Sequence, residues 1–215
     1  MKKAIVRGIA ALFLSAILLG PNDVARAKDV EASGMGSGEL YHLRLHHLHT
    51  GEDLDVVYRV GDTYLPGAIE KLNHFLRDHR TETESHYDPK EFDLLHSLME
   101  KLGRPNGVID IVCGYRTPWS NNLLRSRSAN SGVAQHSQHM QAKAIDIRVP
   151  GVTTVALRNA ALSLHEGGVG YYPVNQFVHV DVGPVREWQY GRATTRSIAK
   201  STRHTRHHAT VANGE

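Results

Sequence analysis

Alternation of apolar and polar residues predicts two short strands in the second half of the chain. In the segment AKAIDIRV, Asp146 falls on the opposite face from Ile145 and Ile147, because successive side chains of a strand point to opposite faces. In the segment FVHVDV, His179 and Asp181 share one face, and the valines between them form an apolar back. If the two strands are neighbours, their apolar sides bury together and Asp146 lies beside His179.

The same alternation occurs on both sides of residues 49–52 and predicts a two-stranded hairpin near the start of the folded region. The hairpin is rich in histidine. We interpret these histidines as exposed strand positions rather than as metal ligands, because no carboxylate pattern accompanies them. They are His42, His46, His47 and His49.

Apolar residues at helical spacing predict helices over residues 65–79, 88–102 and 153–165, and a shorter one over 119–128. Between them the apolar segment VIDIVC, residues 108–113, predicts a further strand that ends in a turn. This mixture predicts an α+β domain. We expect a small antiparallel sheet that carries the polar site on one face and packs helices on the other.

Residues 1–27 have the pattern of a secretory signal peptide, with a basic start, a short apolar run and a small-x-small cleavage site ending at Ala27. The apolar run is shorter than the ~20 residues that span a bilayer. We therefore expect cleavage after Ala27, a periplasmic location and no stable membrane insertion. Residues 28–39 are interpreted as a flexible leader, 40–190 as the domain, and 191–215 as a disordered basic tail.

Charge changes the picture once the signal peptide is removed. The whole chain has a formal net charge of +3, but 21 basic and 21 acidic residues remain after residue 27. Residues 28–190 are mildly acidic, which argues against a nucleic-acid binder because such a domain normally shows a basic face. Cys113 is the single cysteine, so no intramolecular disulfide can form. Its apolar surroundings predict a buried side chain.

The loop of residues 129–138, rich in serine, glycine, asparagine and glutamine, delivers His139 to the start of the Asp146 strand. Two imidazoles and one carboxylate are a set that a catalytic zinc takes while leaving its fourth position to water. A single histidine has many other roles, but the combination with His179 is more specific. We therefore expect one zinc ion per chain.

These residues resemble the LAS-type zinc peptidases, in particular the M15 group and its periplasmic murein endopeptidase branch. The motifs that carry the resemblance are Ser137-x-His139, Ala144-x-Asp146, the VHVD strand, CGYRT at residues 113–117, GGVGYYP at 167–173 and VDVGPVREW at 180–188. The resemblance implies a LAS/hedgehog-like fold with His139, Asp146 and His179 as zinc ligands. It also implies that Arg116 and Ser137 bind substrate.

The proton acceptor needs a separate assignment, because the chain departs from the family pattern at two positions. Ala142 stands in the turn where members commonly have glycine, and Gln176 stands where many have a catalytic glutamate. Glutamine cannot accept a proton as a carboxylate does. Asp181 and His136 are therefore the catalytic candidates, although Asp181 could instead orient His179. Either Tyr171 or Tyr172 is expected to donate a hydrogen bond to substrate.

The function implied by the resemblance is zinc-dependent hydrolysis of peptide cross-links in peptidoglycan, at a bond following a D-amino acid. A D,D- or L,D-carboxypeptidase would use the same metal. The missing glutamate leaves room for a non-catalytic peptidoglycan-binding module, and the 15 histidines for a metal-storage protein. Peptidoglycan is the expected partner, and the sequence leaves the oligomeric state open.

Overall fold

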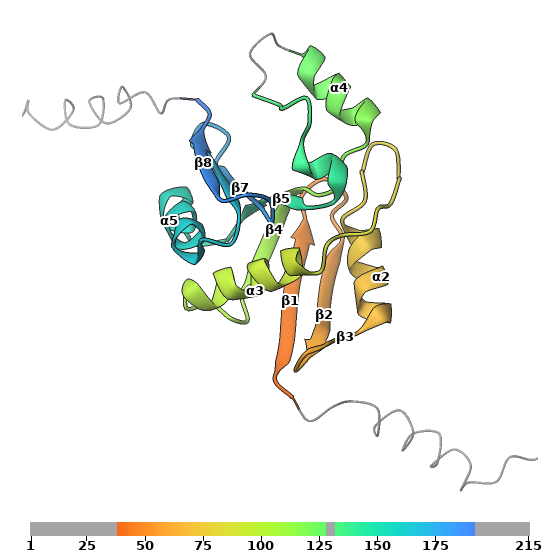
Figure 1. The fold of residues 1–215 in the computed structure, drawn as a ribbon, viewed down its shortest axis with the longest axis vertical. Coiled ribbons are helices and arrows are strands. Elements are labelled where there is room, and N and C mark those ends of the chain that lie inside the picture. Colours follow the sequence, from red (N-terminus) through yellow and green to blue (C-terminus); the bar gives the residue numbers. More distant parts are fainter. Residues whose placement is uncertain (1–37, 128–131, 192–215) are drawn as a thin grey trace, which may run out of the picture. The chain divides into compact units, whose positions relative to one another are not determined.

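The computed structural model describes residues 38–127 and 132–191 (Figure 1). The predicted signal peptide, most of the leader and nearly all of the basic tail lie outside these residues, so those predictions stay predictions. No helix in the described part of the chain is long and apolar enough to cross a membrane.

The described strands form one sheet in the order β3-β2-β1-β4-β5-β7-β6-β8. The strand bounds are β1 Leu40–His47, β2 Asp53–Val60, β3 Thr63–Tyr64, β4 Val108–Cys113, β5 Ala144–Arg148, β6 Gly168–Tyr172, β7 Phe177–Asp181 and β8 Arg186–Gln189. Most neighbours are antiparallel, but β1 pairs with β4 and β6 pairs with β8 in parallel. The α+β class is confirmed, whereas the expected small antiparallel sheet was wrong in size and partly in direction.

All four predicted helices are present in the described residues. Their bounds are α2 Pro66–Phe75, α3 Lys90–Lys101, α4 Pro118–Ser126 and α5 Thr154–Leu164. Helix α2 ends earlier than predicted because the side chains of Arg77 and Asp78 bind other segments of the chain. Arg77 binds Glu52 in the hairpin turn, and the Asp78 carboxylate accepts hydrogen bonds from the backbone and hydroxyl of Thr117.

Three of the helices, α2, α3 and α5, cover the apolar face of the sheet, whereas α4 lies apart from it (Figure 1). Helix α2 packs against β2, α3 against β1 and α5, and α5 against β6 and β7. Ile145 of β5 and Val178 of β7 belong to one buried cluster with Leu157 of α5. Since side chains alternate along a strand, Asp146 and His179 project from the opposite face.

The register of the central strands aligns the polar positions. Strands β5 and β7 are antiparallel neighbours in which Asp146 and His179 are direct partners. On the other side of β5, a bulge in β4 places Cys113 opposite Asp146. The predicted pairing of the two strands is confirmed.

The predicted hairpin is confirmed as β1 and β2, but one of its histidines was assigned wrongly. His47 is 0% exposed, because it continues the buried face begun by Leu43 and Leu45. Two other histidines have carboxylate partners across the hairpin. His42 pairs with Asp55, and His46 pairs with Asp53.

Candidate metal centre

Three side chains converge on the face of the sheet opposite helices α2, α3 and α5. Nε2 of His139 lies 3.2 Å from Oδ1 of Asp146 and 3.1 Å from Nδ1 of His179, and the last two atoms are 2.9 Å apart. Zinc bonds of about 2.0–2.1 Å in a tetrahedral arrangement place ligand atoms about 3.3 Å from one another. The three predicted ligands are therefore brought together at a spacing that fits a zinc ion.

Hydrogen bonds at the far side of each ring orient the two imidazoles. Nδ1 of His139 lies 2.8 Å from the carbonyl oxygen of Gly114, which can only accept, so this nitrogen donates. Nε2 of His179 lies 2.9 Å from Oδ2 of Asp181. The opposite ring nitrogens, Nε2 of His139 and Nδ1 of His179, are therefore the ones that face the centre and would bind a cation once they give up any proton.

A short 3-10 helix, η1 Gln138–Gln141, delivers His139. The Ser137 hydroxyl caps it by accepting a hydrogen bond from the backbone N–H of His139 at 3.3 Å. Ala142 ends it in the left-handed region, with φ of 51° and ψ of 46°. This conformation is easy for glycine and costs free energy for alanine. Ala142 thus adopts the backbone conformation that a glycine would favour in this turn.

The electrostatics of the centre favour a cation. Burial alone would raise the pKa of Asp146 and lower that of His139. Their mutual attraction outweighs burial, so the pKa of Asp146 is well below its ordinary value and the pKa of His139 is raised to about 10. The side chains therefore hold a positive charge between them, and a divalent cation can replace the proton.

Asp181 lies behind His179 rather than in the path of a substrate. It is 0% exposed, and its carboxylate accepts hydrogen bonds from His179, from the backbone of Gly168 and Gly183, and from Arg186 at 2.7 Å. Burial raises the pKa of Asp181, but the bonds from His179 and Arg186 hold it well below its ordinary value. The geometry suits an anion that orients His179.

Arg116, which the resemblance implies to bind substrate, is buried at 7% exposure. One guanidinium nitrogen donates to Oδ1 of Asn121 at 3.3 Å, and the other lies 3.8 Å from Oδ2 of Asp146. Arg116 therefore supports the Asp146 carboxylate while still lining the cavity described below.

Cys113 provides a second grouping of ligand atoms, which the sequence analysis missed. Its Sγ and ligand atoms of His139 and Asp146 all lie within 4.8 Å of one another. Burial raises the pKa of the thiol, but His139 and Arg116 lower it below its ordinary value. The thiol is engaged by Arg116 at 3.3 Å, whereas His179 lies closer to the other two ligands. The distances therefore favour His179 over Cys113 as the third ligand, and the ligand set stays a prediction.

The centre opens into a cavity of about 770 Å³. Tyr172 lines it, and its hydroxyl accepts a hydrogen bond from Nε1 of Trp188 at 3.1 Å. Tyr171 does not line this cavity, because adjacent residues of β6 point to opposite faces of the sheet. Its ring instead lines a smaller cavity and lies under the guanidinium of Arg158. The placement of Tyr171 at the site was therefore wrong. His136 is exposed in the wall of the main cavity, as is part of Ser137.

Gln176 does not line the cavity, although its neighbours Asn175 and Phe177 do. It is exposed in the turn between β6 and β7, with φ of 57°, and its backbone oxygen accepts a hydrogen bond from Arg148. Asp146 is the single carboxylate among the described residues that line the cavity. The proton acceptor is therefore to be sought among the imidazoles of the wall.

Strand β8, which was not predicted, supplies two further side chains. Arg186 pairs with Asp181, and the Trp188 ring lies 5.1 Å from the His179 ring. Gly170 makes this possible, since a Cβ there would lie 2.6 Å from the Trp188 ring. Both residues fall in the VDVGPVREW stretch, but nothing in their spacing indicates that they reach the site.

Comparison with known proteins places the chain in a family. A model of M15 peptidases described as peptidoglycan L,D-endopeptidase MepK matches residues 36–188. The probable peptidoglycan L,D-endopeptidase MepK of Haemophilus influenzae is 40% identical over 147 residues, which cover 68% of this chain and 78% of that protein. Peptidoglycan L,D-endopeptidase MepK of Escherichia coli K12 is 43% identical over 146 residues, covering 68% and 79%. No solved structure matches. The chain therefore belongs to the M15 peptidase family described as peptidoglycan L,D-endopeptidase MepK.

Proposed function

We propose that the protein is a zinc-dependent peptidoglycan endopeptidase that hydrolyses cross-links between an L- and a D-configured centre. The observation that carries this proposal is the convergence of His139, Asp146 and His179 beneath a cavity, in a chain of this family. The relatives' names specify an L,D bond. The family resemblance implied a bond after a D-amino acid, but the L,D bond has the stronger support.

His139, Asp146 and His179 would hold the zinc ion, which when bound polarises a scissile carbonyl and makes water more acidic. The chain's own contribution is to keep these ligands in place. Gly114 fixes the His139 ring and Asp181 fixes the His179 ring, so neither has to reorganise during turnover. Arg116 lies 3.8 Å from the outer oxygen of Asp146 and attracts it as an ion pair.

We assign proton transfer and hydrogen-bond donation to two side chains of the wall, His136 and Tyr172. Burial raises the pKa of Tyr172, so its hydroxyl stays protonated at neutral pH. Because the hydroxyl oxygen accepts from Trp188, its proton is free to stabilise negative charge on a carbonyl oxygen of substrate. We assign His136 as the group that takes the proton from attacking water and returns it to the leaving amine.

We also propose that the protein acts in the periplasm. The support is the signal-peptide pattern of residues 1–27 and the location of its proposed substrate. Peptidoglycan is then the substrate that binds in the cavity.

Incubation of the mature protein with defined muropeptides tests the activity. We expect L,D-cross-linked dimers to yield monomers by mass analysis, with activity lost in chelator and restored by one zinc per chain. If only D,D-linked dimers were cleaved, the hydrolysed bond would be a D,D bond and not the proposed L,D bond. Trimming of monomers would indicate a carboxypeptidase. Binding to sacculi without products would indicate a non-catalytic module.

The ligand set is tested by two matched variants. His179→Ala removes a proposed ligand, so zinc and activity should both be lost. Cys113→Ala should retain one zinc per chain, measured by metal analysis of purified protein. The apolar face of the sheet does not depend on metal, so both variants should stay folded by circular dichroism. Zinc retained in His179→Ala and lost in Cys113→Ala would move Cys113 into the set.

A further inference from the structure

The main cavity carries an excess of positive charge. Four arginines of the described residues line it, against the single carboxylate of Asp146. They are Arg80, Arg116, Arg125 and Arg186. A bound zinc ion would add to this positive charge.

Two of the four arginines are occupied by the metal centre itself. Arg186 forms an ion pair with Asp181 at 2.7 Å, and Arg116 lies 3.8 Å from Asp146 and donates to Asn121. Their charges are already balanced by carboxylates that support or form the zinc site. We therefore assign Arg116 and Arg186 to the support of the metal centre and not to the binding of a charged ligand.

Within the described part of the chain, Arg80 and Arg125 have no carboxylate partner of this kind. No described carboxylate forms an ion pair with either guanidinium, and residues 128–131, which follow α4, include no acidic residue. Both side chains are partly buried. Partial burial of an unpaired cation costs free energy, so a ligand that pairs with it gains correspondingly.

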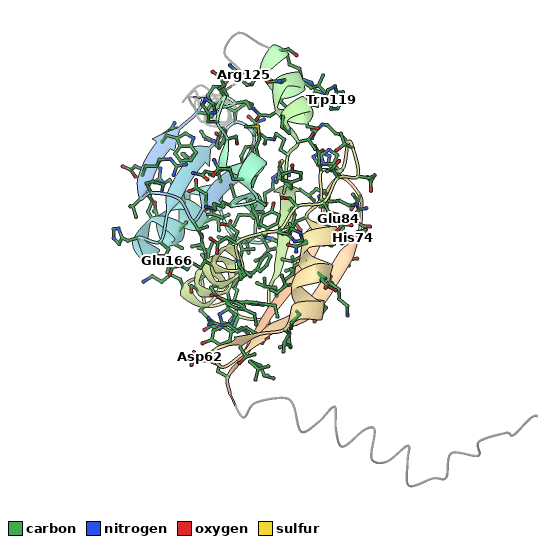
Figure 2. The ribbon with its side chains drawn as sticks, turned by 45° about the vertical axis from the view of Figure 1, so that its right-hand side comes forward. Asp62, His74, Glu84, Trp119, Arg125 and Glu166 are labelled. Carbon is green, nitrogen blue, oxygen red and sulfur yellow. The ribbon has the colours of Figure 1, made fainter. Side chains whose placement is uncertain are left out.

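Local structure fixes the backbone position of both arginines. The backbone N–H of Arg80 donates to Oδ1 of Asp78 at 3.1 Å, and the other Asp78 oxygen accepts from Thr117, which caps α4. Arg125 lies in the last turn of the same helix, and Figure 2 shows it on α4. One buried aspartate thus ties the Arg80 segment to the helix that carries Arg125.

We propose that Arg80 and Arg125 are carboxylate-binding residues that select peptide substrates with free, unamidated carboxylates near the scissile bond. The proposal rests on the proposed function and specifies its substrate class. The planar guanidinium fork matches a carboxylate by two parallel hydrogen bonds, which gives orientation as well as attraction. Amidation removes the charge and one acceptor oxygen, so an amidated stem peptide is a poorer substrate.

The test crosses enzyme variants with substrate charge. Arg80→Gln and Arg125→Gln are assayed on a cross-linked dimer with free carboxylates and on dimers amidated at one carboxylate at a time. We expect kcat/KM on the free dimer to fall roughly tenfold for each variant, the scale of one charge-assisted hydrogen bond. On the dimer whose matching carboxylate is amidated, variant and wild type should be equal. The amidated dimer on which variant and wild type have the same kcat/KM identifies the substrate carboxylate that the substituted arginine binds.

Arg127→Gln is the matched control. Arg127 follows α4, is exposed and does not line the cavity, so its loss should leave kcat/KM unchanged on every dimer. Zinc content should be normal in all three variants. Wild-type rates in Arg80→Gln and Arg125→Gln, or equal losses on free and amidated dimers, would overturn the proposal.

Binding to zinc-depleted protein keeps the two proposals separate. Calorimetric affinity for the free dimer should exceed that for the amidated dimer, and the difference should shrink in both variants. If no dimer is cleaved but this pattern appears, the proposed function fails and the carboxylate sites stand. If dimers are cleaved without any charge preference in rate or affinity, only the carboxylate sites fail.

Discussion

The contacts of a single side chain, Asp181, separate two chemical roles that the sequence left open. Residues two apart on a strand share a face, so both proton transfer and orientation of His179 were compatible with its position. In the structure its two oxygens accept from four groups, and the carboxylate does not line the cavity. A general base needs a free lone pair within reach of water. Asp181 has no free lone pair for a water molecule, and its carboxylate has no access to the cavity.

Asp181→Asn should therefore weaken zinc binding rather than chemistry. The neutral amide loses the charge that stabilises the His179 tautomer, so we expect zinc affinity to fall roughly 10- to 100-fold, measured by competition with a chelator. At saturating zinc the rate should largely recover. Normal zinc affinity with a rate lowered by about 10²- to 10⁴-fold would instead make Asp181 the base. Asp110→Asn, on β4 away from the cavity, serves as the control.

At the scale of the element, the edge of the sheet beyond β7 depends on small residues. Gly168 and Gly170 of β6 leave room for side chains of β8. A Cβ at Gly168 would lie 2.4 Å from Arg186, and one at Gly170 would lie 2.6 Å from Trp188. The parallel pairing of β6 and β8 brings both side chains over β6. These glycines are thus required by close packing rather than by backbone conformation.

Gly170→Ala should displace the Trp188 ring from its place beside His179. We expect the free energy of unfolding to fall by about 1–3 kcal/mol in urea titration, the usual cost of overpacking. Activity should fall as well, because Tyr172 loses its hydrogen bond from Trp188. Trp188 fluorescence, read in a Trp119→Phe background, reports the displacement.

Gly67→Ala provides the comparison for this substitution. Nothing lies within 4 Å of a Cβ at Gly67, which is in α2, so alanine should be neutral or stabilising there by up to ~1 kcal/mol. Unchanged Trp188 fluorescence and activity in Gly170→Ala would mean that the ring does not need this position.

The spacing of apolar residues predicted β5 and β7 and their pairing. In each strand the polar residues at the site alternate with isoleucine or valine, so the apolar face fixed both the register and the position of Asp146 and His179, although the polar face is buried as well. Strand β8 has no alternation and forms through a parallel pairing with β6, which short-range patterns do not encode. The contact of Cys113 with the metal ligands depends on a bulge between neighbouring strands, and the burial of Arg116 depends on α4.

For the whole molecule, a group of histidines links stability to pH. His47 is fully buried, and the His49 and His79 rings stack at 4.2 Å beside it. Burial, then repulsion from His49 and Arg77, outweighs the attraction of Glu52 and lowers the pKa of His47 to about 4. Nδ1 of His47 also accepts hydrogen bonds from the backbone N–H groups of His49 and Thr50, which requires an unprotonated nitrogen.

The free energy of unfolding should therefore decrease as the pH is lowered. Unfolded His47 takes up a proton near pH 6.5, whereas folded His47 does so only near pH 4. Its contribution is thus fully present above about pH 6.5 and is lost as the pH falls to 4. At about 1.4 kcal/mol per pKa unit the loss is on the order of 3 kcal/mol, and His79, whose pKa burial also lowers to about 4, adds to it.

Urea titrations between pH 7 and pH 4 test this on three proteins. His47→Asn keeps an acceptor for the two backbone N–H groups but cannot titrate, so its stability should depend less on pH than that of the wild type. His86→Asn removes an exposed histidine and should follow the wild type. The metal centre titrates in all three proteins, so the difference between their slopes isolates His47. Parallel curves for His47→Asn and the wild type would show that His47 is not the source of the pH dependence.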